Sequence, residues 1–126
     1  MQLQPIYISK YTRADAISDG TLIDVTDMAK EAGFKVPVAL TSALWSKCVE
    51  PLDADRKRGQ DEKGRLWDIL TVLFFEIRRS KSKGHELRYS VRFQMGSRLK
   101  LVQMKAHIGP GDLGEPVFTI MLPEED

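Results

Sequence analysis

The sequence predicts a single α+β domain, in which a three-stranded antiparallel meander packs on one long helix, with short helices in the N-terminal part. The length of 126 residues suits one domain, so we assign residues 1–126 to it. Apolar residues recur with helical spacing up to about position 80, and after Gly84 their period changes from 3.6 to 2 residues. Because helical segments come before strands instead of alternating with them, an α+β arrangement is favoured over a parallel α/β sheet.

The first helix is predicted between Thr12 and Gly20. Thr12 is a suitable N-cap, since its hydroxyl can accept a hydrogen bond from the amide of Asp15, and Gly20 can take the left-handed conformation that ends a helix. Other short elements follow before the long helix. We expect extended segments at 22–25 and 36–38, a second helix that begins at Asp24 or Thr26 and ends at Gly33, and a third that is capped by Thr41 and stopped by Pro51.

The polar segment 52–65 is predicted to be an exposed loop, because it is rich in charge and contains two glycines. The long helix is expected over 66–80. Its apolar residues are too many for a single stripe, which indicates burial on most sides. Phe75 falls on its narrow polar side, where we expect the N-terminal segments to cover it.

Three strands are predicted in the C-terminal part, at 86–95, 99–108 and 116–122. The first alternates strictly between apolar and polar residues, as a half-buried strand does. Gly96-Ser97 is the expected turn to the second strand. In that strand the alternation slips at Leu101-Val102, which suggests a β-bulge or a change of face. The last strand is apolar at nearly every position, which indicates that both of its faces are covered.

Charge is distributed unevenly along the chain, although the formal net charge is only +1. Residues 78–105 hold nine basic residues and the single acid Glu86, a net charge of +8, while the remaining residues hold ten basic and seventeen acidic ones. Such separated charge creates a local field that can select partners even when the total charge predicts none. The basic residues of this segment are Arg78, Arg79, Lys81, Lys83, Arg88, Arg92, Arg98, Lys100 and Lys105.

The polar face of the meander is the best candidate site. If the hairpin turns at Gly96-Ser97, one basic face brings together Arg88, Arg92, Gln103, Lys105 and His107. Basic side chains along a sheet neutralise phosphates and release counterions, so nucleic acid is one expected partner. An acidic protein fits the same face equally well, and a merely solvated face is the third interpretation, since antiparallel sheets commonly expose one polar side.

Catalytic and metal sites find little support. Cys48 is the single cysteine, so no internal disulfide or multi-cysteine zinc site is expected, and the thiol is interpreted as a small buried hydrophobe. We expect no cofactor and no metal. A small enzyme with a minimal site of His107, Lys105 and Arg92 is the less favoured alternative, because histidine can gain or lose a proton near neutral pH. That alternative requires a concave pocket around His107.

Localisation can also be predicted. The longest uncharged apolar-rich run, 69–75, is far shorter than the roughly 20 residues that cross a bilayer, and the first residues lack the apolar stretch of a signal peptide. A soluble protein of a reducing compartment is expected, without membrane association. The sequence leaves the oligomeric state open.

Three separated blocks carry a resemblance to a known family: YTRADAISDGTLIDVTDMAKEAGF at 11–34, DEKGRLWDIL at 61–70 and GPGDLGEPVFTIMLPEED at 109–126. In this order they resemble a family of small uncharacterised proteins encoded on bacterial plasmids, prophages and integrative elements. The resemblance implies a mobile genetic element and a bacterial cytoplasm, and it implies no activity.

The combined expectation is a non-catalytic binding protein of a mobile element that binds nucleic acid or an acidic protein through its basic sheet face. The alternative is an inhibitor of a bacterial host-defence complex, of the anti-restriction or anti-CRISPR type, that acts by protein binding. Mimicry of DNA is disfavoured, because it would need a dense acidic surface, and here the acids are spread over termini and loops.

Overall fold

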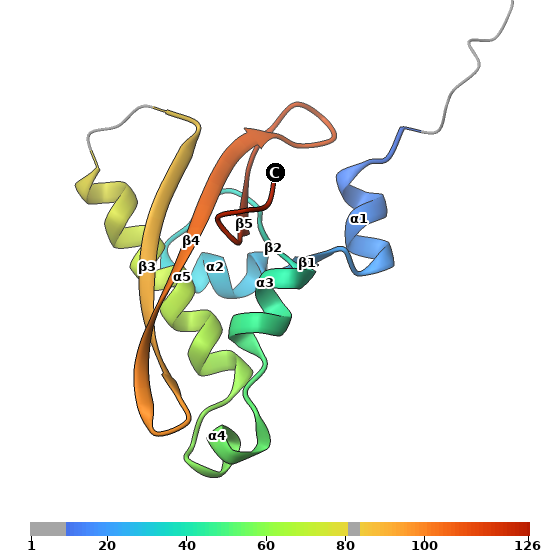
Figure 1. Cartoon of the computed structure of the whole chain (residues 1–126). Coiled ribbons are helices and arrows are strands. Elements are labelled where there is room, and N and C mark those ends of the chain that lie inside the picture. The colour runs from blue at the N-terminus through green and yellow to red at the C-terminus, as the bar shows by residue number, and fades with distance from the viewer. Residues whose placement is uncertain (1–9, 81–83) are drawn as a thin grey trace, which may run out of the picture.

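A computed structural model of the chain describes residues 10–80 and 84–126 and confirms the α+β class (Figure 1). The helices and strands follow one another as α1 (Arg13–Asp19), β1 (Leu22–Asp24), α2 (Thr26–Ala32), β2 (Val38–Thr41), α3 (Ser42–Leu44), a π-helix η1 (Trp45–Val49), α4 (Asp53–Lys57), α5 (Glu62–Arg79), β3 (Glu86–Met95), β4 (Arg98–Pro110) and β5 (Pro116–Met121).

The sheet is larger than the predicted meander. It has five strands in the order β1-β2-β5-β4-β3. Strands β3, β4 and β5 form the expected antiparallel meander, but β5 also pairs in parallel with β2, which in turn pairs antiparallel with β1. The two short extended segments near the N-terminus therefore belong to the same sheet, and the prediction of only three strands was wrong. The strand β5 is central and covered by neighbours on both edges.

The predicted bulge in β4 is absent. Strands β3 and β4 pair without interruption from Glu86↔His107 to Met95↔Arg98. Leu99 and Leu101 consequently lie on the polar side of the sheet, opposite Gln94 and Arg92. The apparent slip in the sequence pattern comes from two leucines on an exposed face and not from an extra residue.

The main core lies between the sheet and the helices α2 and α5. Tyr89, Val91 and Phe93 of β3 are buried in it together with Ile69, Leu70 and Leu73 of α5. Helix α2 ends at Gly33, where a φ of +114° and only 2.6 Å between an added Cβ and Phe74 Cε1 leave room for no side chain. A glycine is therefore required where α2 packs against α5.

The opposite side of the sheet, called the outer face here, is covered only in part. Helix α1 contacts it through Arg13, whose Nη1 donates to Thr119 Oγ1 of β5 at 2.8 Å. The caps of α1 are those predicted, with a capping box between Thr12 and Asp15 and a left-handed Gly20. The distal part of the hairpin formed by β3 and β4 extends away from α1 (Figure 1).

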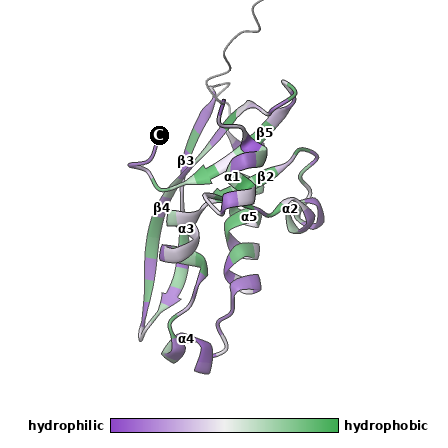
Figure 2. Cartoon of the chain, turned by 90° about the vertical axis from the view of Figure 1, so that its right-hand side faces the viewer, coloured by the Kyte–Doolittle hydropathy of each residue, from purple (hydrophilic) through white to green (hydrophobic). Residues whose placement is uncertain are grey.

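Segment 52–65 is not the predicted loop. It contains helix α4 and the first turn of α5, which is capped by Asp61 and begins four residues earlier than expected. Figure 2 shows α4 as mainly hydrophilic, yet its Asp55 is only 2% exposed. Helix α4 and the tip of the β3–β4 hairpin lie at the same end of the molecule (Figure 1).

The expected cover over Phe75 is also absent. Its side chain is 69% exposed, although it makes an edge contact with Phe74 at 6.1 Å between ring centroids. Helix α2 packs on another side of α5, and the exposed stripe of α5 is wider than its sequence indicated, since Trp67 is 40% exposed as well.

Candidate binding surface and cleft

The five predicted site residues share the outer face. In the β3–β4 register, Arg88 lies opposite Lys105, Ser90 opposite Gln103, and Glu86 opposite His107. Since residues directly opposite each other in an antiparallel pair project to the same side, the pairing brings these side chains onto one surface. Arg92 lies on the same face, opposite Leu101. Arg88, Arg92, Gln103 and His107 are exposed, whereas Lys105 is only 7% exposed.

The distal part of this surface is both basic and apolar. Leu99 and Leu101 are 67% and 63% exposed, and neither was expected to be accessible. We call this surface the hairpin patch, and it consists of Arg88, Arg92, Leu99, Leu101 and Gln103. Register could have revealed the leucines from the sequence: once the turn is placed at Gly96-Ser97, strand alternation puts residues 99 and 101 beside the polar side chains of β3.

Not all of the basic segment adds to the patch. Arg78 and Arg79 are exposed at the end of α5, and Arg79 pairs with Glu76 at 2.7 Å. Arg88 Nε lies 3.3 Å from Glu86 Oε2, while no described carboxylate lies within 4 Å of Arg92. Lys81 and Lys83 lie outside the described residues. Arg92 is therefore the basic side chain of the patch with the least internal compensation in the described part of the chain.

The other part of the outer face is a cleft of about 720 Å³ between α1 and strands β4 and β5. Lys105 and His107 line it, but Arg92 does not. The enzyme alternative required a concave pocket around His107, and the cleft provides one. Arg92, the third residue of that proposed site, lies outside the cleft. Sequence reasoning missed Arg13, which comes from α1 and carries the second strong cation of the cleft. No local signal identifies it, because its position depends on the packing of α1 over β5.

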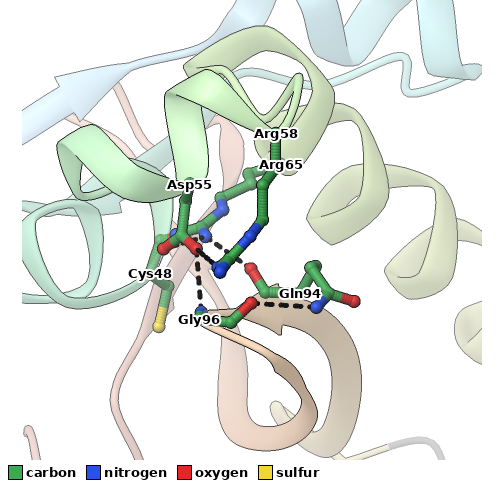
Figure 3. A network of polar contacts seen from close by, with 6 residues as sticks. All are labelled: Cys48, Asp55, Arg58, Arg65, Gln94 and Gly96. Carbon is green, nitrogen blue, oxygen red and sulfur yellow. Dashed lines mark hydrogen bonds and ion pairs between the residues drawn. The ribbon is translucent and has the colours of Figure 1, made fainter.

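A buried network at the far end of the hairpin fixes the position of the hairpin tip (Figure 3). Arg65 donates through Nη2 to Gln94 O at 2.7 Å and to Asp55 Oδ2 at 3.4 Å, and its Nη1 donates to Cys48 O at 3.2 Å. The amide of Gly96 donates to Asp55 Oδ1 at 2.8 Å. We call Asp55 and Arg65 with these backbone partners the distal lock. It joins α4, α5, η1 and the β3–β4 turn.

The Cys48 side chain is completely buried, as predicted. Burial raises the pKa of its thiol, against the smaller opposing effects of Lys47 and Arg65. A thiol of this kind is a weak nucleophile at neutral pH. Among residues 10–80 and 84–126, His, Cys, Asp and Glu side chains form no cluster of three or more that could hold a metal ion.

Comparison with known proteins identifies one family model, described as a family of unknown function (DUF6573), which matches residues 5–126. No curated protein and no solved structure matches the chain. Within the described residues, no helix combines the length and the apolar character that a membrane crossing requires. The resemblance to an uncharacterised family is thereby confirmed, and the mobile-element setting stays a prediction.

Proposed function

We propose that this chain, which belongs to the DUF6573 family of unknown function, is a non-catalytic binding protein that binds an acidic protein partner through the hairpin patch. The observation that carries the proposal is the exposure of Leu99 and Leu101 beside Arg92 on one face of the β3–β4 hairpin. Exposed apolar groups rimmed by polar ones are typical of protein interaction sites. Arginine is enriched in such interfaces, and charged residues at their rim favour partners of opposite sign.

Leucines favour a protein over nucleic acid at this surface. Proteins bind single strands by stacking bases on aromatic rings, and Tyr89 and Phe93 of this hairpin are buried on the core face instead. Nucleic acid remains the second candidate, because a two-stranded ribbon with exposed arginines has the dimensions that enter the major groove. Binding of a host-defence complex, in the mobile-element setting that the sequence suggests, is a specific form of the first candidate.

Binding without catalysis is favoured by the surroundings of His107. No described side chain donates to or accepts from its imidazole. A general base normally needs such a partner to hold the ring in one orientation. The hairpin patch itself contains no nucleophile with an adjacent base.

The test is a comparison of three purified, tagged proteins in pull-downs from a nuclease-treated bacterial lysate. The wild type and the control Phe75→Gln, which changes an exposed side chain on α5, should capture the same partner. The double variant Arg92→Gln/Leu101→Gln should lose it. All three should melt at similar temperatures, because the altered side chains are exposed.

Fluorescence anisotropy with single- and double-stranded DNA and RNA at low salt separates the two candidates. Absence of nucleic-acid binding, together with a nuclease-resistant capture that depends on Arg92 and Leu101, supports the protein partner. If the wild type binds oligonucleotides in a salt-sensitive way and the double variant does not, the partner of the patch is nucleic acid and not a protein. Identical capture by all three proteins would contradict a role for the patch.

A further inference from the structure

The cleft between α1 and the outer face has a floor built from paired strand residues. Lys105 of β4 lies opposite Met121 of β5, and His107 lies opposite Thr119. Lys105 and Thr119 are thus diagonal neighbours, a separation of about 7–8 Å that long side chains bridge. With a volume of about 720 Å³, the cleft is in the size range of small-molecule sites.

The Lys105 side chain is mostly covered, but its ammonium group reaches the cleft and has an incomplete set of partners. Its side chain is 9% exposed, and its Nζ lies 3.7 Å from Glu86 Oε1, which is too long for a hydrogen bond. Glu86 is 43% exposed and also pairs with Arg88, so its charge is shared. An ammonium group has three donors, and since the Lys105 Nζ is not among the described side-chain atoms that are fully buried without a hydrogen-bond partner, its donors face the open cleft. No other described residue meets them.

Arg13 lies above the same floor, and among the described residues its guanidinium donates only to neutral oxygens. Its Nη1 donates to Thr119 Oγ1 at 2.8 Å and its Nη2 to Phe118 O at 2.9 Å. No described carboxylate lies within 4 Å of the guanidinium. Two of its five N–H donors are used, and three are left. Partial burial lowers the pKa of Arg13, against the opposing effects of Asp24, Asp112 and Glu115, which agrees with a guanidinium that lacks a close anion.

The acids that line the cleft do not supply that anion. The Glu125 carboxylate accepts hydrogen bonds from Thr41 Oγ1 at 2.7 Å and from the Leu122 amide at 2.8 Å, which hold it over β2. Asp126 is exposed, and Glu86 is divided between Arg88 and Lys105. A hydroxyl donor remains in the cleft besides the cations, since Thr12 lines it and its Oγ1 only accepts, from the Asp15 amide, whereas the Tyr11 hydroxyl already donates to Asp19.

From this arrangement we infer that the cleft binds a small phosphorylated molecule, with its phosphate group between Lys105 and Arg13. A phosphate offers at least three acceptor oxygens, which suits three free ammonium donors and three free guanidinium donors better than the two oxygens of a carboxylate do. The rest of the ligand would occupy the cleft beside His107 and the hydroxyl groups. This site is separate from the hairpin patch and does not depend on it.

The experiment is a titration of the ¹⁵N-labelled protein with inorganic phosphate, followed by amide shifts in two-dimensional NMR spectra, with malonate titrated in parallel. In the wild type, phosphate should give saturable shifts at the amides of Lys105, His107 and Thr119. Lys105→Met should weaken phosphate binding by about tenfold or more, as expected for loss of a charge-assisted contact. The control Arg92→Gln, on the same face but outside the cleft, should bind as the wild type does.

Each other outcome overturns the inference. Shifts that do not saturate, shifts centred on β3 instead of the cleft, or equal affinity in Lys105→Met would remove the site. If malonate binds saturably and phosphate does not, the cleft is a site for carboxylates and not for phosphates. If Lys105→Met lacks the dispersed spectrum of a folded protein, Lys105→Gln takes its place, since it keeps a polar side chain. The variant Arg92→Gln/Leu101→Gln should bind phosphate as the wild type does. The phosphate titration therefore tests the cleft alone, whatever the pull-downs show for the hairpin patch.

Discussion

The two ends of the β3–β4 hairpin each hold a buried cation next to a carboxylate, but the two pairs differ in how completely they are satisfied. In the distal lock, Arg65 and Asp55 both have side chains 3% exposed, and three backbone groups complete their contacts. In the cleft, Lys105 is nearly as buried, yet its carboxylate partner is 43% exposed and 3.7 Å away. A pair enclosed by several backbone partners fixes structure, whereas an ammonium group that faces an open cleft is available to a ligand.

The distal lock is not fully saturated either. The Nε of Arg65 makes no hydrogen bond to a described residue. The guanidinium stacks near the ring of Phe93, 5.8 Å from its centroid, which compensates part of the charge. The contrast with Lys105 therefore rests on the number of partners and their burial, and not on perfect satisfaction of every donor.

The largest expected effect comes from breaking the distal lock. Asp55→Ala leaves Arg65 buried without its carboxylate, and we expect a loss of about 3–5 kcal/mol in the free energy of unfolding. Urea denaturation monitored by circular dichroism measures this loss. The double variant Asp55→Ala/Arg65→Met should recover part of it, because no buried charge is left unpaired; Arg58, which lies 3.6 Å from Asp55, is 49% exposed and stays solvated. A loss below 1 kcal/mol for Asp55→Ala would show that the pair does not hold the hairpin tip.

Lys105→Met should change the free energy of unfolding much less than Asp55→Ala does, because the Lys105 pair is more exposed. Methionine fills a similar volume without a charge, and Glu86 is exposed enough to be solvated alone. We expect the free energy of unfolding to stay within about 1 kcal/mol of the wild type, or to rise. The same urea titration is sufficient. A loss as large as that of Asp55→Ala would mean that Lys105 is also a structural ion.

The reactivity of Cys48 reports opening at the distal end. Its carbonyl takes part in the lock, and its thiol is buried with a raised pKa. Reaction with a disulfide reagent at pH 8 should be slow in the wild type and in Lys105→Met. In Asp55→Ala it should be about a hundredfold faster or more, if labelling follows the opened population and each 1.4 kcal/mol is worth a factor of ten. Equal labelling rates in all three proteins would show that the accessibility of Cys48 does not depend on the distal lock.

The smallest expected effect concerns the attachment of α1 above the cleft. Hydrogen bonds from the amides of Ala14 and Arg13 lower the pKa of Asp112. A carboxylate with a lowered pKa in the folded state stabilises that state above its unfolded pKa, and the contribution is lost as the pH falls through the lower, folded value. The amide shifts of Arg13 and Ala14 should therefore titrate in acid, below the range of an ordinary aspartate. Asp112→Asn should abolish this titration, and an unchanged titration in that variant would assign it to another acid.

The local sequence pattern predicted most of the helices and strands, but it did not predict how the strands pair into one sheet. The N-cap at Thr12, the left-handed Gly20 and the alternation in β3 are properties of neighbouring residues, and each was predicted. The parallel pairing of Val38–Thr41 with β5 joins segments about 80 residues apart and leaves no trace in a short window. The burial of Asp55 was missed for the same reason, since its partners come from the β3–β4 turn and from α5, outside its own neighbourhood in the chain.

The candidate site was predicted in part. All five expected residues lie on one face, because strand alternation determines the side to which each residue projects. Their division between an open patch and a cleft was not predicted, because it depends on where α1 packs. Whether either region binds a partner stays a prediction that the experiments above address.

The central position of β5 has a consequence for how the protein is made. The strands β1 and β2 on one side and β3 and β4 on the other touch through β5, which follows all of them in the chain. During synthesis the two halves of the sheet must wait, with their apolar edges unpaired, until residues 116–121 have left the ribosome. Transient chaperone capture or misassembly is therefore most expected in this interval, and the final step of folding should be the insertion of one six-residue strand.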